Sequence, residues 1–195
     1  MTKQIRIKCY TDGSCMPNPG IGGWGYVLFL TIGESSSRQF CGNGGKQRST
    51  NNQMELQGII ELLKECKNYS NATIDIYCDS MYVINGIILS PKGTNEENNK
   101  DCLTLITLPL QGWLKGWMND NYKNSGNNSF YSEGFWKKAS TPSTNREEWY
   151  ELYYLIVKLI NLNIKLSVGY VKAHSGVYGN EIADKLAKKF SSAGK

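Results

Sequence analysis

The sequence lacks any run of apolar residues long enough to cross a membrane. A membrane-spanning helix needs about 20 consecutive, mostly apolar residues, and polar or charged side chains interrupt every apolar stretch before that length. The first residues also lack the unbroken apolar segment of a secretory signal, because Arg6 and Lys8 separate the isoleucines. We therefore expect no membrane partner and an intracellular protein, in the cytoplasm or the nucleus.

The six cysteines lack the C-x-x-C spacing of common metal and redox motifs. Several of them lie in apolar stretches, where a reduced thiol packs as a small hydrophobic side chain. A chain of 195 residues can bury a sizeable core without disulfide or metal cross-links. Free thiols and one domain are therefore predicted.

Acidic residues are scarce at both ends of the chain. Residues 1–50 and residues 161–195 each carry six basic and two acidic side chains, whereas the middle carries ten basic and thirteen acidic ones. The net charge of +5 is a modest excess, which by itself only favours a polyanionic partner.

Apolar periodicity predicts a mixed order of strands and helices. Strands are predicted at residues 5–11, 24–30, 36–42, 73–79 and 164–171, and helices at 51–67, 81–89, after Pro109, at 146–160 and at 180–190. The first three strands are joined by turn residues and indicate an antiparallel meander. The whole order is typical of an α/β domain.

Two helices begin with an N-cap pattern, in which a small polar residue is followed three positions later by Gln or Glu. Thr50 and Gln53 form the first pattern, and Asn145 and Glu148 form the second. The sequence thus predicts helix starts at both places.

Two polar, Asn-rich segments lack apolar periodicity. We expect them to be surface insertions near residues 90–110 and 119–134 of a single domain that spans residues 1–195.

Two predicted strands end at an aspartate, Asp12 and Asp79. If these strands are neighbours in a sheet, the two Cα atoms lie about 5 Å apart, which suits the binding of one metal ion by both carboxylates. Each aspartate alone has a simpler interpretation. Asp12 with Gly13 is a common turn pair, and Asp79 with Ser80 can begin a helix.

Two more carboxylates lie near the starts of predicted helices. Glu55 is in the first turns of the helix at 51–67, and Asp184 follows Asn180 by one helical turn. Four converging carboxylates repel one another unless cations neutralise them, and oxygen ligands select hard ions such as Mg²⁺ or Mn²⁺. The single histidine, His174, precedes the last helix, where it could exchange a proton with a substrate.

Four sequence blocks stand in order along the chain: YTDGS, TNNQMEL, IYCDS and KAHSGVYGNEIADKLA. In this order they resemble ribonuclease H of type 1, and the resemblance covers most of the chain. It implies the ribonuclease H-like α/β fold, a mixed five-stranded sheet flanked by helices. It also implies a divalent-metal-dependent endoribonuclease. The implied substrate and partner is an RNA/DNA hybrid, whose RNA strand the enzyme cuts to 5′-phosphate and 3′-hydroxyl products.

The resemblance assigns roles to particular residues. The implied metal ligands are Asp12, Glu55, Asp79 and Asp184, and His174 is the implied proton-handling group. Two Mg²⁺ ions about 4 Å apart, or Mn²⁺ in their place, are the implied cofactors. We expect a monomer.

The resemblance also implies contacts with the hybrid. The residues matched to contacts with the minor groove and its 2′-hydroxyls are Cys15, Asn18, Asn51 and Asn52. Met81, which matches the residue of eukaryotic members, and Asn180 are also implied substrate contacts. Those matched to a phosphate pocket and to an aromatic channel for the DNA strand are Arg48, Thr50, Asn145, Tyr82, Trp113 and Trp117. Other interpretations stay open: the tryptophans can be core residues, and Asn145 can be only an N-cap.

The chain departs from the family in the charge of its handle, a protruding segment that is rich in lysine in well-studied members. Residues 112–150 carry five basic and four acidic side chains, so hybrid affinity is expected to rest on Lys137, Lys138 and the basic ends. Two alternatives remain: the nuclease domain of a reverse transcriptase or retroelement, and a module that holds hybrid or double-stranded RNA without cutting it. The four mutually repelling carboxylates argue against the second.

Overall fold

The computed structural model describes residues 4–88, 103–106, 110, 112–117 and 144–192. Most of both predicted insertions lies outside the described residues, and so do Lys137 and Lys138. The expectations for these segments therefore stay predictions.

One mixed sheet forms the centre of the molecule, with strand order β3-β2-β1-β4-β6-β5. The strands are β1 (Ile5–Cys15), β2 (Gly20–Ile32), β3 (Arg38–Ser49), β4 (Ala72–Cys78), β5 (Leu103–Ile106) and β6 (Lys165–Tyr170). The helices are α1 (Asn51–Cys66), α2 (Met81–Ile87), α3 (Gly112–Trp117), α4 (Arg146–Asn161) and α5 (Tyr178–Ser191). Strands β1, β2 and β3 form the predicted antiparallel meander, and β1, β4 and β6 run parallel.

Within the described residues the sheet has six strands, not the five that were predicted. The additional strand, β5, pairs antiparallel with β6 at the edge of the sheet, and its Ile106 is buried. Its four residues lie beside the polar segment at 90–102, so the sequence pattern assigned them to the insertion. A run this short is at the lower limit of strand length and carries little periodic signal.

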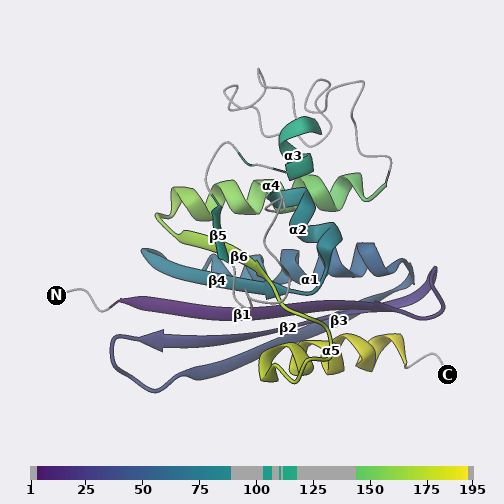
Figure 1. The fold of residues 1–195 in the computed structure, drawn as a ribbon, viewed down its shortest axis with the longest axis horizontal. Coiled ribbons are helices and arrows are strands. Elements are labelled where there is room, and N and C mark those ends of the chain that lie inside the picture. The colour runs from purple at the N-terminus through teal and green to yellow at the C-terminus, as the bar shows by residue number, and fades with distance from the viewer. Residues whose placement is uncertain (1–3, 89–102, 107–109, 111, 118–143, 193–195) are drawn as a thin grey trace.

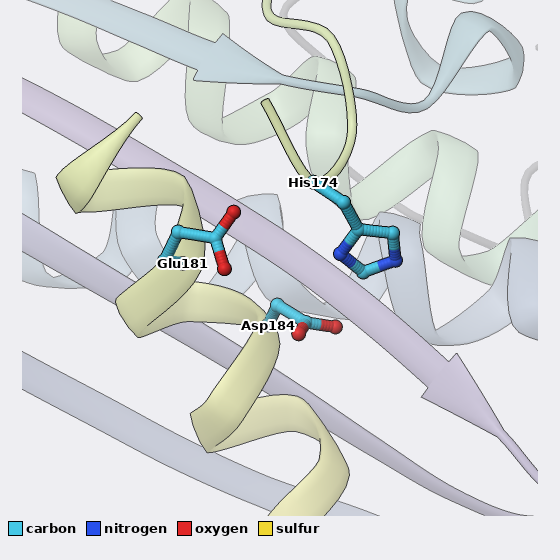
Figure 2. Close-up of side chains that lie close together, drawn as sticks. All are labelled: His174, Glu181 and Asp184. Atoms are coloured by element: carbon cyan, nitrogen blue, oxygen red, sulfur yellow. The ribbon is translucent and has the colours of Figure 1, made fainter. Parts of the chain in front are cut away.

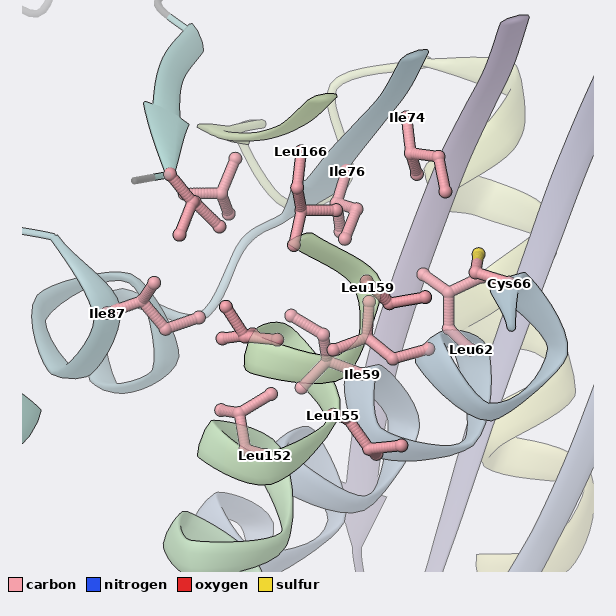
Figure 3. Close-up of a cluster of buried hydrophobic side chains, with 14 of the residues drawn as sticks. Ile59, Leu62, Cys66, Ile74, Ile76, Ile87, Leu152, Leu155, Leu159 and Leu166 are labelled. Atoms are coloured by element: carbon pink, nitrogen blue, oxygen red, sulfur yellow. The ribbon is translucent and has the colours of Figure 1, made fainter. Parts of the chain in front are cut away.

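The main core lies between the sheet and two helices, α1 and α4 (Figure 1). Figure 3 shows this layer, where Ile59 and Leu62 of α1 and Leu159 of α4 pack towards Ile74 and Ile76 of β4. Parallel strands covered by helices read as nearly continuous apolar runs. That is why the sequence pattern identified this part of the fold.

Helix α5 covers the opposite face of the sheet, over β1, β2 and β3 (Figure 1). It packs closely because small residues meet there. A Cβ added to Gly23 would lie 2.2 Å from the carbonyl oxygen of Ala187, and one added to Gly25 would lie 2.6 Å from that of Ala183. The glycines of β2 therefore set how near α5 approaches the sheet.

The two N-cap patterns have different outcomes. The Thr50 hydroxyl accepts a hydrogen bond from the Gln53 amide at 3.2 Å, so the first cap is confirmed. The prediction that the Asn145 side chain caps α4 is wrong. Asn145 has a left-handed backbone with φ of 54°, and its side chain donates to the Tyr82 hydroxyl at 3.1 Å instead.

The described cysteines are free thiols, as predicted. They are Cys9, Cys15, Cys41, Cys66 and Cys78, whereas Cys102 lies outside the described residues. None of the described helices is both long and apolar enough to cross a membrane.

Candidate functional site

Asp12 and Asp79 emerge side by side from two neighbouring strands. The parallel ladder between β1 and β4 ends at the pair of Thr11 and Cys78, and each aspartate is the next residue along the chain. β1 does not end at Asp12, as the sequence suggested, but continues to Cys15 in its antiparallel pairing with β2. The simple turn interpretation of Asp12 is therefore wrong.

Helix α1 brings Glu55 to the two aspartates. One carboxylate oxygen from each of Asp12, Glu55 and Asp79 lies within 4.8 Å of the others. The approach depends on Gly13, because a Cβ there would lie 2.2 Å from the backbone nitrogen of Glu55. The absence of a side chain at this position lets the helix backbone contact the strand backbone.

The clustered carboxyl groups hold their protons more tightly than usual. Burial, followed by the charge of Asp79, raises the pKa of Asp12 to about 7, although the Gly13 amide donates to Asp12 at 2.7 Å and opposes the shift. Burial and the charges of Asp12 and Asp79 also raise the pKa of Glu55. Without a cation, proximity and desolvation both disfavour the charged forms.

The donor set fits a hard divalent cation. The Glu55 Oε2 atom is buried and has no hydrogen-bond partner among the described residues. A buried carboxylate oxygen without a partner is costly, and a cation would satisfy it while neutralising the cluster. All the ligand atoms are carboxylate oxygens, the donors that Mg²⁺, Ca²⁺ and Mn²⁺ prefer.

Asp184, the fourth predicted ligand, lies on α5 in a second group and not among the three carboxylates within 4.8 Å of one another. Figure 2 shows its carboxylate with those of Glu181 and the ring of His174, whose ligand atoms lie within 4.8 Å of one another. Burial is the main cause of the raised pKa of Asp12 and Asp79, and the charge of Asp184 adds to both shifts. Lys188 pairs with Asp184 at 2.7 Å.

Glu181 was missed by the sequence analysis. It lies three residues before Asp184 on α5, a spacing that places two side chains on one helix face, and this was the signal available. His174 is exposed in the loop before α5, with an unusual left-handed backbone of φ 49°.

Asn180 connects α5 to the end of β4. Its side-chain amide donates to the Asp79 carboxylate at 3.2 Å. The residue is only 2% exposed, and its own Oδ1 atom is buried without a hydrogen-bond partner among the described residues.

The predicted groove contacts gather at the start of α1. The Asn51 side chain accepts from the backbone amide of Cys15 at 2.7 Å. The backbone amide of Asn51 donates to the Asn18 side chain at 3.2 Å. The Cys15 thiol is buried and donates to the carbonyl oxygens of Pro17 and Ser49, each at 3.2 Å. Cys15 therefore holds the loop in place through both its backbone and its side chain.

Tyr82 connects the predicted phosphate pocket to the predicted aromatic channel. Its hydroxyl accepts from Asn145 at 3.1 Å and from the Trp149 indole at 3.0 Å. Its ring lies 5.6 Å from that of Trp113, and Trp117 lies 5.5 Å from Trp149. Trp149 was not a predicted site residue. Its fully buried ring lies on α4 and joins that helix to α2 through the hydrogen bond to Tyr82.

The remaining predicted contact residues are exposed at the same end of the fold. Arg48 is at the end of β3, Thr50 and Asn52 are at the start of α1, and Met81 begins α2 with 42% of its surface exposed. The structure leaves these side chains open to a ligand.

Comparison with known proteins decides the family. The RNase H family model matches residues 4–192. The chain belongs to the ribonuclease H family. Ribonuclease H of Bartonella bacilliformis is 35% identical over 189 residues, which are 96% of this chain and 89% of that protein. Ribonuclease H of Francisella tularensis subsp. novicida is 33% identical over 187 residues, which are 96% of this chain and 91% of that protein. As a member of this family, the chain is a nuclease of the hydrolase class.

Solved structures show the same ribonuclease H fold. LC9-RNase H1, a type 1 enzyme with the type 2 active-site motif, has a TM-score of 0.61 and 17% identity, over 97% of this chain and 73% of that one. LC11-RNase H1, in complex with RNA/DNA hybrid, has a TM-score of 0.52 and 14% identity, over 94% of this chain and 97% of that one. At these identities the likeness establishes the fold alone.

Proposed function

We propose that this chain cleaves the RNA strand of RNA/DNA hybrids by metal-dependent hydrolysis, leaving 5′-phosphate and 3′-hydroxyl ends. The observation that carries the proposal is the cluster of Asp12, Glu55 and Asp79, whose ligand atoms lie within 4.8 Å of one another. Its buried Glu55 oxygen has no hydrogen-bond partner in the described part of the chain. Family membership supports it, as does the hybrid bound to the related LC11-RNase H1.

Two divalent cations, Mg²⁺ or Mn²⁺, are the cofactors that suit this site. Asp12, Glu55 and Asp79 would hold them with clustered carboxylate oxygens, and Asp184, whose charge acts on Asp12, would complete the set from α5. When bound, such cations activate the attacking water and stabilise charge on the leaving 3′ oxygen. Asp12 and Asp79 come from adjacent strands, so the rigid sheet fixes their separation.

His174 is proposed to exchange a proton with the reacting oxygens. His174 is exposed, and a nitrogen of its ring lies within 4.8 Å of carboxylate oxygens of Glu181 and Asp184 (Figure 2). An imidazole can take and release protons near neutral pH. We expect His174→Ala to lower kcat by about 100-fold, the typical contribution of a positioned general acid or base.

Recognition of the RNA strand is proposed to involve the loop that Asn51 holds. Asn18 and Asn51 are linked by a hydrogen bond of 3.2 Å at the start of α1, and Asn52 is exposed beside them. Amide side chains can both donate to and accept from a 2′-hydroxyl, the group that distinguishes RNA from DNA. The pocket of Arg48, Thr50 and Asn145 would bind a phosphate of the DNA strand.

The test is cleavage of end-labelled substrates in Mg²⁺ by the parent and by Asp12→Asn. We expect the parent to cut the RNA of the hybrid and to leave RNA/RNA and DNA/DNA duplexes intact. Asp12→Asn should be slower by about 1,000-fold, since loss of a metal ligand removes several kcal/mol of transition-state stabilisation. Ligation or phosphatase treatment of the fragments identifies their ends.

Asp75→Asn is the matched control, because Asp75 lies on β4 but outside the carboxylate cluster. It should cut at the parental rate. Equal rates for Asp12→Asn and the parent would contradict the mechanism. Tight binding of the hybrid without cleavage in either Mg²⁺ or Mn²⁺ would instead favour a module that holds hybrids.

A further inference from the structure

A buried carboxylate that the proposed reaction does not use lies in the first turn of α4. Glu148 is 8% exposed and accepts hydrogen bonds from two distant parts of the chain. The Gln53 side chain of α1 donates to it at 2.6 Å, and the Lys46 ammonium of β3 pairs with it at 3.2 Å. A carboxylate can accept several hydrogen bonds at once, so one side chain joins three elements.

Each residue of this junction is close in the chain to a predicted phosphate contact. Lys46 precedes Arg48 by two residues on β3. The backbone amide of Gln53 donates to the Thr50 hydroxyl at 3.2 Å.

The third connection is on α4 itself. The Asn145 carbonyl accepts from the Trp149 amide at 3.0 Å, which ties Asn145 to the helical turn that contains Glu148. The same turn therefore carries a phosphate contact at one end and the buried carboxylate at the other.

The packing of α1 on α4 has other support. Lys64 bridges Glu61 of α1 at 2.7 Å and Glu151 of α4 at 2.8 Å, and a shared apolar core joins the helices. A buried carboxylate is costly unless it is fully paired, so holding the helices together does not by itself account for Glu148. Its partners indicate a more local task.

We propose that Glu148 is a positioning residue for substrate binding. Through Gln53 and Lys46 it fixes the start of α1 and the end of β3 against α4, so that Thr50, Arg48 and Asn145 face the same phosphate. The proposal rests on the proposed function, because the phosphate belongs to the DNA strand of the hybrid. A carboxyl group offers a phosphate no attractive charge, so Glu148 does not bind the phosphate itself and acts only by orienting its neighbours.

The experiment compares steady-state kinetics on the hybrid for the parent, Glu148→Ala, Glu148→Gln and Glu151→Ala. Glu148→Ala should raise KM by about tenfold with kcat within about twofold, since binding is lost and the chemical step is not. Glu148→Gln keeps an oxygen that accepts from Gln53, so it should recover most of the affinity. Glu151→Ala removes a salt bridge three residues away on the same helix and should leave KM unchanged.

A merely structural role predicts a different result. If Glu148→Ala only unfolds part of the sample, kcat per total enzyme falls while KM stays parental, and the proposal is overturned. An unchanged KM in a fully active variant also overturns it. Both of these outcomes are measured against a parent that cuts the hybrid. They are therefore distinct from failure of the proposed function, in which the parent itself does not cut the hybrid.

A double substitution tests the route through Gln53. If Glu148 acts through Gln53, then Gln53→Ala combined with Glu148→Ala should raise KM no more than Glu148→Ala alone. KM increases that multiply would show that the two residues act independently and would contradict this route.

Discussion

The side-chain amide of Asn180 donates to the Asp79 carboxylate at 3.2 Å and thereby joins the last helix to the end of β4. The bond crosses 101 positions of the chain. It orients one proposed metal ligand and opposes the rise in pKa that burial causes at Asp79.

Removing this orienting bond should weaken metal binding. We expect Asn180→Ala to raise the Mg²⁺ concentration for half-maximal cleavage by about tenfold, the usual effect of losing a group that orients a metal ligand. A Mg²⁺ titration of the cleavage rate measures it. Asn161→Ala, at the exposed end of α4, serves as control. An unchanged Mg²⁺ requirement in Asn180→Ala would show that Asp79 needs no such orientation.

The raised pKa of Asp12 predicts how the metal-free protein responds to pH. Between the ordinary value of 3.8 and the folded value of about 7, the folded state holds a proton that the unfolded state has released. Stability should therefore fall as pH rises through this window. In chelator, Asp12→Asn should be more stable than the parent at pH 8 by about 1–3 kcal/mol, with no such difference at low pH.

Urea denaturation at several pH values, with chelator or with Mg²⁺, tests this expectation. Mg²⁺ should stabilise the parent more than Asp12→Asn, because a ligand that binds only the folded state adds to its stability. A flat pH profile for the metal-free parent would contradict the assignment.

Close packing of α2 on α4 depends on Gly86. A Cβ there would lie 2.0 Å from the ring of Trp149, which is fully buried. Gly86→Ala should destabilise the fold by about 1–3 kcal/mol, as overpacking does. In α3, no described atom lies within 4 Å of a Cβ added to Gly116, so Gly116→Ala should be neutral or stabilising by up to about 1 kcal/mol. Thermal unfolding of the two variants is the measurement, and equal effects would refute the packing argument.

The Tyr82 hydroxyl accepts two hydrogen bonds, and its removal should affect stability and binding together. Tyr82→Phe leaves the buried Trp149 indole N–H without its acceptor, at a cost of about 1–3 kcal/mol in the free energy of unfolding. It also releases Asn145, so KM for the hybrid should rise. Tyr154→Phe, at an exposed position on α4, should change neither quantity. Parental KM in Tyr82→Phe would mean that Asn145 does not depend on Tyr82.

The sequence was most informative where local pattern and spatial position coincide. Asp12 and Asp79 end the parallel pairing of buried strands whose apolar residues are readable in the chain, so their proximity could be predicted. Glu148 and Glu181 were not identified as site residues, because acids in the first turn of a helix are expected for their interaction with the helix dipole. For Glu181, only its spacing from Asp184 indicated more. The partners of Glu148 are 95 and 102 positions away, beyond any local pattern.

Asn145 shows a further limit of local patterns. Its residue type and spacing are those of an N-cap, but its side chain donates a hydrogen bond to the Tyr82 hydroxyl and does not cap the helix. Its left-handed backbone, which Asn tolerates better than most residues, is compatible with that choice. A contact 63 positions away thus determined the conformation of one residue.

The missing side chain at Gly13 has a consequence for the cost of binding. Since the backbones of β1 and α1 touch there, two main chains in contact hold the Cα atoms of Asp12 and Glu55 at a fixed separation. The repulsion between these carboxylates is then already present in the folded protein before a cation arrives. Little reorganisation is left for the moment of binding, so the site is preorganised, and the stability of the empty protein bears the energetic cost.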